Sequence, residues 1–245
     1  RAAGCMGPCV RGPVLRLGDG TFYQGVKPED VAEIVREHLV GGRTVDRLIA
    51  HDEASGKPQA QDQDIPFFTK QTQIVLRNCG KIDPERIEEY IARDGYAALA
   101  KVLGELSPEQ VVEEMKVSGL RGRGGAGFPT FMKWEFTRRA PGDLKYVLCN
   151  ADEGDPGAYM DRSVLEGDPH SVIEGMAIAA YTIGAAQGYV YVRAEYPLAV
   201  ARLKKAIAQA HACGFLGKKI LGTAFSFDLD IRMGSGAFVC GEETA

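Results

Sequence analysis

The segment from Gly119 to Trp134 constrains this chain more than any other stretch. It reads GLRGRGGAGFPTFMKW, and so many glycines let a backbone turn tightly and bring its N–H groups close to a ligand. Gly122–Gly127 fits G-x-G-x-x-G, but that pattern should follow a strand, whereas Pro108–Val117 has helical spacing. The segment therefore predicts a phosphate-binding loop of an architecture other than the Rossmann fingerprint. The alternative is a mobile linker, which the apolar Phe128 and Phe131 disfavour.

Composition places the chain among globular proteins of one large or two ordinary domains. It has 245 residues, of which 45% are hydrophobic and 25% are charged, with a net charge of −4. That charge and the scattered Lys and Arg residues give no nucleic-acid footprint. The most apolar stretch, 171–186, is interrupted by Glu174, and predicts a buried helix because a bilayer span needs about 20 apolar residues. Arg1 at the start and a helix-like end at Ala245 indicate a fragment of a longer subunit.

Residues 1–50 have the pattern of the back half of a small α/β domain. Strand-like residues 14–17 and 21–23 flank a Gly-Asp-Gly turn, which predicts a hairpin, and Pro28 opens a helix. Residues 51–82 are polar and irregular, which predicts an interdomain linker.

Cys5 and Cys9 lie in a Gly/Pro-rich loop near the start of the chain. Two thiolates this close can hold one iron of an iron–sulfur cluster, although a cluster needs four ligands. The alternative is two unrelated thiols. The other four cysteines are expected to be small buried apolar residues.

Residues 83–245 change from helices to alternating strands and helices. Strands are predicted at 145–149, 189–192, 227–231 and 237–240, with helices at 172–186 and 197–212 between them. This alternation predicts a parallel sheet with crossover helices, and ligands then bind at the carboxyl ends of the strands.

Acidic residues follow the first and last predicted strands: Asp152, Glu153 and Asp155 after the first, Glu242 and Glu243 after the last. The bland alternative is a set of solvated loop acids. At strand ends facing a glycine loop, however, carboxylates accept hydrogen bonds from ribose hydroxyls. They would also repel a 2′-phosphate and so favour NAD(H) over NADP(H).

Several common catalytic motifs are absent from the sequence. No G-K-[ST] closes a glycine loop, and neither H-E-x-x-H nor G-x-S-x-G occurs. The lone histidines His170 and His211 are expected to be structural.

Three long motifs together resemble a known family. GLRGRGGAGFPTFMKW at 119–134, CNADEGDPGAYMDR at 149–162 and GAFVCGEETA at 236–245 are similar to the NADH-binding flavoprotein subunit of respiratory complex I. They are also similar to its soluble relatives in NAD-linked and electron-bifurcating hydrogenases and formate dehydrogenases. The likeness covers roughly residues 65–245. Residues 1–50 resemble the end of a thioredoxin-like [2Fe–2S] domain, and this fusion favours the soluble relatives.

The resemblance implies a Rossmann-like FMN- and NADH-binding domain at 83–245. The implied cofactor-binding residues are Gly122, Arg123, Gly124, Gly125, Phe128, Lys133, Phe136, Asn150, Asp152, Glu153, Asp155, Phe238, Gly241, Glu242, Glu243 and Thr244. The glycine loop and Lys133 would hold the FMN phosphate and ring edge, and residues 150–153 the ribityl chain and ring. Phe128 and Phe136 would stack on the NADH adenine, and the acids near the C-terminus would close the nucleotide pocket.

Two positions depart from the family pattern. Asp155 stands where the family often has Glu, which shortens the reach toward the nicotinamide. Phe238 stands where it often has Tyr, which removes a hydroxyl.

The implied function is an NADH dehydrogenase (diaphorase) module. FMN would accept hydride from NADH and pass single electrons to iron–sulfur clusters of partner subunits. The same reaction could run in reverse and reduce NAD. No catalytic residue is named, because the cofactors carry the chemistry. Cys5 and Cys9 would be two [2Fe–2S] ligands, and the [4Fe–4S] cysteines would lie beyond Ala245. We expect a cytoplasmic protein, at most peripheral to a membrane complex. The alternative is a docking scaffold that has lost its flavin.

Overall fold

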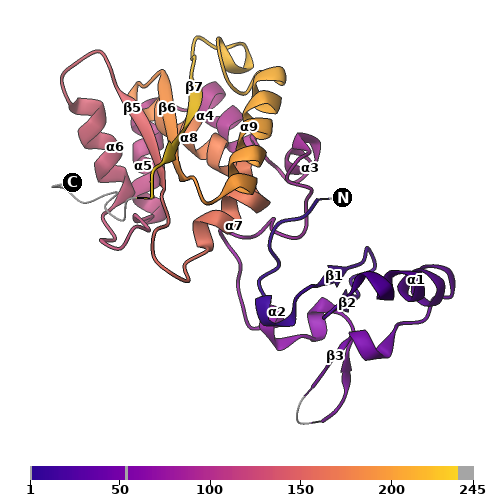
Figure 1. Ribbon diagram of the computed structural model, residues 1–245. Coiled ribbons are helices and arrows are strands. Elements are labelled where there is room, and N and C mark those ends of the chain that lie inside the picture. The colour runs from indigo at the N-terminus through magenta and orange to yellow at the C-terminus, as the bar shows by residue number, and fades with distance from the viewer. Residues whose placement is uncertain (1, 53–54, 237–245) are drawn as a thin grey trace. The chain divides into compact units, whose positions relative to one another are not determined.

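The chain forms two compact units in a computed structural model, which describes residues 2–52 and 55–236. One unit runs from Met6 to Val75, and the other combines residues 1–5 with 76–245 (Figure 1). The division at 75/76 differs from the boundaries at 50 and 82 expected from the sequence, which stay predictions.

The unit at 6–75 is built on a short hairpin and a helical segment. Its strands and α-helices are β1 (Leu15–Arg16), β2 (Phe22–Tyr23), α1 (Val31–Ile34), β3 (Ala50–His51), β4 (Pro58–Gln59) and α2 (Pro66–Thr69). A π-helix at Val35–Val40 continues α1. β1 pairs antiparallel with β2, which confirms the predicted hairpin, and Pro28 opens a 3-10 turn that leads into α1.

Residues 51–75, expected to be linker, carry regular structure. β4 pairs antiparallel with β3, and α2 follows it. A core around Tyr23, Ile34 and Leu48 holds this unit together.

The larger unit has a helical first half and an α/β second half. Its elements are α3 (Ile87–Ile91), α4 (Ala97–Glu105), α5 (Pro108–Ser118), α6 (Thr130–Arg139), β5 (Tyr146–Ala151), α7 (Met160–Gly167), α8 (Pro169–Ile183), β6 (Gln187–Arg193), α9 (Pro197–Ala212), a 3-10 turn (Ile220–Gly222) and β7 (Asp228–Gly234). A Ser107–Gln110 capping box begins α5, and Gly119 ends it in the left-handed region. The strand expected at 237–240 lies outside the described residues.

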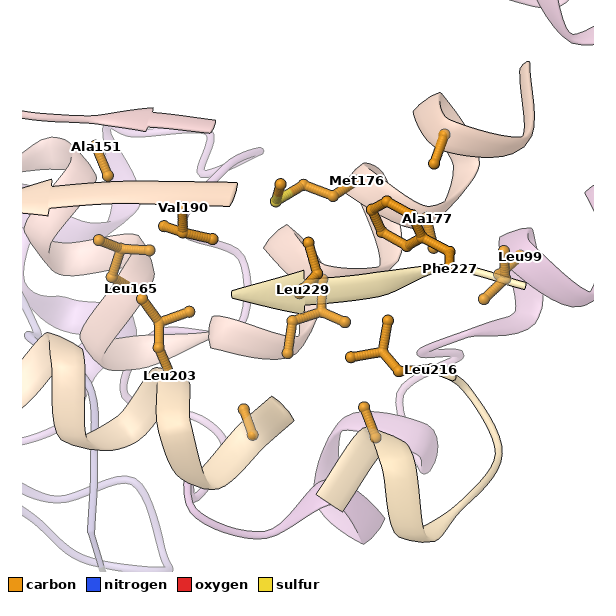
Figure 2. Packing of buried hydrophobic residues seen from close by; sticks show 14 of the residues in the cluster. Leu99, Ala151, Leu165, Met176, Ala177, Val190, Leu203, Leu216, Phe227 and Leu229 are labelled. Atoms are coloured by element: carbon orange, nitrogen blue, oxygen red, sulfur yellow. The ribbon is translucent and has the colours of Figure 1, made fainter. Parts of the chain in front are cut away.

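The three strands form one parallel sheet in the order β5-β6-β7, which confirms the predicted α/β class with a parallel sheet. Alternate residues of each strand face α8 and α9. Val190 is fully buried and Leu229 is 6% exposed on that side, and Figure 2 shows these side chains packed with Met176, Ala177 and Leu203. On the opposite side Leu148 is 71% exposed. The core therefore lies on one face of the sheet, and the register brings the three carboxyl ends together.

No helix in the described part of the chain is long and apolar enough to cross a membrane.

Candidate cofactor-binding site

The glycine loop between α5 and α6 is closed at its base by backbone hydrogen bonds. The N–H of Gly122 donates to the carbonyl of Phe128 at 2.8 Å, and the N–H of Thr130 donates to the carbonyl of Leu120 at 3.0 Å. Gly125 has a φ of 111° and Gly127 one of 61°, conformations that glycine adopts readily and other residues rarely adopt. The sequence therefore builds a tight, pinned loop rather than a linker.

The tip of this loop is open and its base carries a cation. A Cβ on Gly124 or Gly125 would meet no atom within 4 Å, whereas one on Gly122 would lie 3.5 Å from Nζ of Lys133. Lys133 projects from the first turns of α6, whose N-cap, Pro129, supplies no side-chain cap. Backbone N–H groups, a helix N-terminus and an ammonium group together suit a phosphate. The loop thus has the chemical features of a phosphate-binding site.

Two phenylalanines beside this loop present exposed rings. Phe128, at the end of the loop, is 38% exposed, and Phe136, on α6, is 55% exposed. Exposed rings of this kind provide surfaces on which a flat base can stack. Arg123 is also exposed.

Asn150 and Asp152 lie at the carboxyl end of β5, on the edge of the sheet where β6 and β7 also end. Asn150 Oδ1 accepts a hydrogen bond from the N–H of Asp152 at 3.0 Å. A Cβ on Gly234, at the end of β7, would lie 3.2 Å from Oδ1 of Asp152 and 3.0 Å from the hydroxyl of Tyr191. Glycine at this position therefore lets the end of β7 approach the acid that follows β5.

Glu153 differs from the other acids of this loop because it is buried, at 9% exposure. Its Oε1 accepts from the N–H of Asp161 at 3.0 Å and its Oε2 from the N–H of Arg162 at 3.1 Å. The hydroxyl of Tyr196 also donates to Oε2, at 3.2 Å. The carboxylate caps the start of α7, and its predicted contact with a flavin stays a prediction. Asp155 is exposed.

The acids also act on neighbouring pKa values. Burial raises the pKa of Asp161, and the nearby Glu153 charge raises it further. Burial raises the pKa of the Cys149 thiol on β5 to about 11, with a smaller contribution from Asp161. Cys149 is therefore a protonated, unreactive thiol near neutral pH.

Three residues at the end of β6 were missed by the sequence reasoning: Arg193, Glu195 and Tyr196. Arg193 pairs with Glu195 at 3.2 Å, and a Cβ on Gly236 would lie 3.6 Å from Oε1 of Glu195. Their signal in the sequence is Arg-Ala-Glu-Tyr directly after an apolar strand, the same pattern that identified the acids after β5.

The predicted residues thus form two groups, the loop residues with Lys133 and the strand-end residues at 150–155. In Figure 1 the α5–α6 loop and the β5–α7 loop both lie toward the lower side of the larger unit. The remaining predicted residues, Phe238, Gly241, Glu242, Glu243 and Thr244, lie outside the described residues.

Cys5 and Cys9 are both free and exposed, and the division between the two units falls between them. Within residues 2–52 and 55–236, no three His, Cys, Asp or Glu side chains are grouped to hold a metal ion. An iron–sulfur cluster needs four ligands, and two cysteines alone do not make up a cluster site.

Residues 115–245 match the family model described as the Nuo51 FMN-binding domain. The chain belongs to this family. The match covers the glycine loop, Lys133 and the sheet, so the resemblance inferred from the three motifs is confirmed.

Relatives within the family come from hydrogenases and NADH-quinone oxidoreductases. The chain is 61% identical over 176 residues to the NADP-reducing hydrogenase subunit HndC of Solidesulfovibrio fructosivorans. This alignment covers 72% of this chain and 36% of that protein. It is 54% identical over 172 residues to an NADH-quinone oxidoreductase subunit of Rhizobium meliloti (strain 1021), covering 70% and 41%. It is 45% identical over 163 residues to an NADH-quinone oxidoreductase subunit of Escherichia coli (strain K12), an alignment that covers 66% of this chain and 37% of that protein. The chain thus spans between 36% and 41% of the length of these relatives.

Solved structures of a hydrogenase share this fold. An NAD+-reducing [NiFe]-hydrogenase in its air-oxidized state aligns with a TM-score of 0.54 at 24% identity, over 96% of this chain and 35% of that chain. At this identity the likeness supports the fold alone.

Proposed function

We propose that this chain is the flavin- and nicotinamide-binding part of an NADH:acceptor oxidoreductase, a diaphorase module of a hydrogenase, formate dehydrogenase or complex I-like assembly. The observation that carries the proposal is the pinned glycine loop with Lys133 at its base, in a chain of the Nuo51 FMN-binding family. When bound, FMN accepts hydride from NADH and passes single electrons on to iron–sulfur clusters.

The chain's own residues bind and orient the cofactors in this proposal. Arg123, Gly124 and Gly125 offer backbone N–H groups to the FMN phosphate, and Lys133 balances its charge. Gly122 closes the loop around this site, because its own N–H is donated to the carbonyl of Phe128. Asn150 and Asp152 accept hydrogen bonds from the ribityl hydroxyls, and the exposed carboxylate of Asp155 faces the nicotinamide side.

The nucleotide would lie against the aromatic side of the loop. Phe128 and Phe136 stack on the adenine, and the segment containing Phe238, Gly241, Glu242, Glu243 and Thr244 closes the pocket. Glu153 acts through its position in the loop, because its carboxylate is already occupied by protein donors.

The same proposal extends to the N-terminal residues and to the partner subunits. Residues 1–50 would be the end of a thioredoxin-like domain, with Cys5 and Cys9 as two ligands of a [2Fe–2S] cluster. Further iron–sulfur subunits would be its partners, and the assembly would be cytoplasmic or peripheral to a membrane complex.

The test identifies the flavin in the full-length protein and asks whether NADH reduces it. Flavin released by denaturation is identified by chromatography, and the bound form is titrated anaerobically with NADH. We expect FMN that bleaches with NADH. A folded, colourless protein that takes up no added FMN would contradict the proposal and favour the docking scaffold.

A further inference from the structure

The loop that joins β5 to α7, residues 152–159, is fixed to the protein by Glu153. The carboxylate of this buried residue accepts two N–H groups from the start of α7 and the hydroxyl of Tyr196. Glu153, one of the residues that the resemblance implies to bind the flavin, is therefore an internal anchor. Of the other two acids in the loop, Asp152 is half-buried and Asp155 is exposed.

Arg193 provides a second attachment for the same loop, this time through the backbone. Its Nη1 donates to the carbonyl of Glu153 at 2.5 Å. Its Nη2 and Nε lie 3.2 Å and 3.4 Å from the carboxylate oxygens of Glu195. One planar guanidinium thus bridges the loop after β5 and the acid after β6, a geometry that the fixed fork of arginine suits and a lysine cannot reproduce.

The ring of Tyr196 packs against the guanidinium group of Arg193. Tyr196 is 6% exposed, and its ring contacts two guanidinium groups, Arg193 at 5.5 Å and Arg162 at 5.6 Å from the ring centre. Arg162 is held in turn by Glu166 at 2.9 Å. Both cations contact an aromatic ring, and that ring's hydroxyl is hydrogen-bonded to Glu153. We call the group formed by Glu153, Arg193 and Tyr196 the strand-end clamp. Each of its three residues contacts the other two.

The clamp also places a positive charge among several negative ones. Asp152 and Glu195 both act on Arg193 and raise its pKa, the hydrogen bond to Glu195 being the larger cause. Without that cation, the carboxylates after β5 and β6 would repel one another. The loop would then lose both a hydrogen bond and its charge balance.

We propose that Arg193 is a positioning residue that holds the β5–α7 loop in the conformation needed to bind the flavin, acting through the strand-end clamp and not by touching the cofactor. This inference rests on the proposed function for the identity of the ligand, but the ordering of the loop can be measured without any ligand. A loop fixed before binding needs less ordering when the ligand arrives, so the clamp raises affinity.

The test compares Arg193→Met with Arg232→Met in the full-length protein. Arg232 lies on β7, paired in register with Tyr191. It has its own aspartate partner at 2.8 Å and lies over the ring of Tyr189 at 5.3 Å. The control removes the same charge and the same kind of ring contact from the same sheet, without touching the loop.

We expect Arg193→Met to speed amide hydrogen exchange at residues 154–162 of the flavin-free protein. The dissociation constant for added FMN should rise about tenfold, which is about 1.4 kcal/mol. Arg232→Met should change neither quantity. Arg193→Lys should restore part of the affinity, because it keeps the charge and loses the fork.

Three outcomes would overturn the inference. The first is unchanged exchange and affinity in Arg193→Met, and the second is an equal effect of Arg232→Met. The third is a loss of affinity that merely parallels a lower unfolding midpoint, which would make Arg193 a stability residue only. If the unsubstituted protein binds no FMN, the proposed function fails, while the exchange comparison still decides whether the clamp orders the loop.

Discussion

The hydroxyl of Tyr90 donates a hydrogen bond of 2.5 Å to the carboxylate of Glu174 inside the core of the larger unit. The same carboxylate accepts the N–H groups of Tyr96 at 2.9 Å and Leu99 at 3.0 Å. Glu174 therefore joins α8 to the start of α4, where these N–H groups have no partner within the helix. The residue that interrupts the most apolar stretch of the sequence is the one that fixes two helices together.

Glu174→Gln should destabilise the larger unit by roughly 3 kcal/mol, because buried donors lose a charged acceptor. Urea unfolding followed by the fluorescence of Trp134, the chain's single tryptophan, measures the change. Glu113→Gln on exposed α5, where the acid pairs with Lys116 at 3.4 Å, should cost less than about 1 kcal/mol. Equal effects of the two substitutions would rule out the structural role assigned to Glu174.

His170 should make the stability of this unit fall in acid. It is buried, with Nδ1 2.9 Å from the hydroxyl of Tyr96 and Nε2 3.2 Å from Oε1 of Gln209. Burial lowers its pKa from 6.5 to about 4. The unfolded chain therefore binds the extra proton between these values, so this contribution is complete above pH 6.5 and falls as the pH drops toward 4. The loss below pH 4 is roughly 3 kcal/mol.

The measurement is the slope of unfolding free energy against pH between 7 and 4.5, in the chain and in His170→Gln. The variant should have a shallower slope, whatever its stability at neutral pH. His51→Gln, at an exposed position of the other unit, should leave the slope unchanged. An identical slope in His170→Gln would contradict the assignment.

Gly124→Ala should weaken FMN binding without lowering stability. A methyl group there meets no protein atom within 4 Å, so it costs little in folding but occupies the open tip of the loop. We expect the FMN dissociation constant to rise roughly tenfold with an unchanged unfolding midpoint. Gly104→Ala, at an equally open position of α4, should leave binding unchanged and stabilise the helix by about 0.5–1 kcal/mol. Normal FMN affinity in Gly124→Ala would argue against this loop as the flavin site.

Lys133→Gln should weaken the binding of FMN more than that of riboflavin, which lacks the phosphate. A charge-assisted hydrogen bond is worth about 1.5–3 kcal/mol, so FMN affinity should fall roughly 10- to 100-fold. Isothermal titration with both flavins measures the difference, with Lys116→Gln on exposed α5 as the control. An equal loss for both flavins would place Lys133 away from the phosphate.

Glu242→Gln and Glu243→Gln should increase the use of NADPH, because either change removes a charge that repels the 2′-phosphate. The expected rise in kcat/KM for NADPH is roughly tenfold, measured with an artificial electron acceptor. The choice between NADH and NADPH needs this test, because a relative at 61% identity is named as NADP-reducing. NADPH activity that stays at background in both variants would refute the charge argument, and high NADPH activity in the unsubstituted protein would show that the acids do not discriminate.

The sequence alone determined most helices and strands of the larger unit and the glycine loop between α5 and α6, because their signals are local, whereas β4 and α2 lie in a segment expected to be linker. The Ser107 capping box, the end of α5 at Gly119 and the start of α9 at Pro197 all depend on residues within one or two helical turns. The parallel sheet could also be predicted, since apolar runs alternated with helices. The glycine loop could be predicted to bind a phosphate, because its glycine content and the lysine that follows are local features of the sequence.

Tertiary structure decided which acids are free and which are anchors. Asp152 and Glu153 are neighbours in sequence and both follow a buried strand, yet only Glu153 turns inward to the start of α7 and to Tyr196. The partner of its carbonyl, Arg193, is 40 residues away. Such pairings depend on how β5 and β6 align in the sheet, and no local pattern encodes that register, because it is fixed by the packing of both strands against α8 and α9.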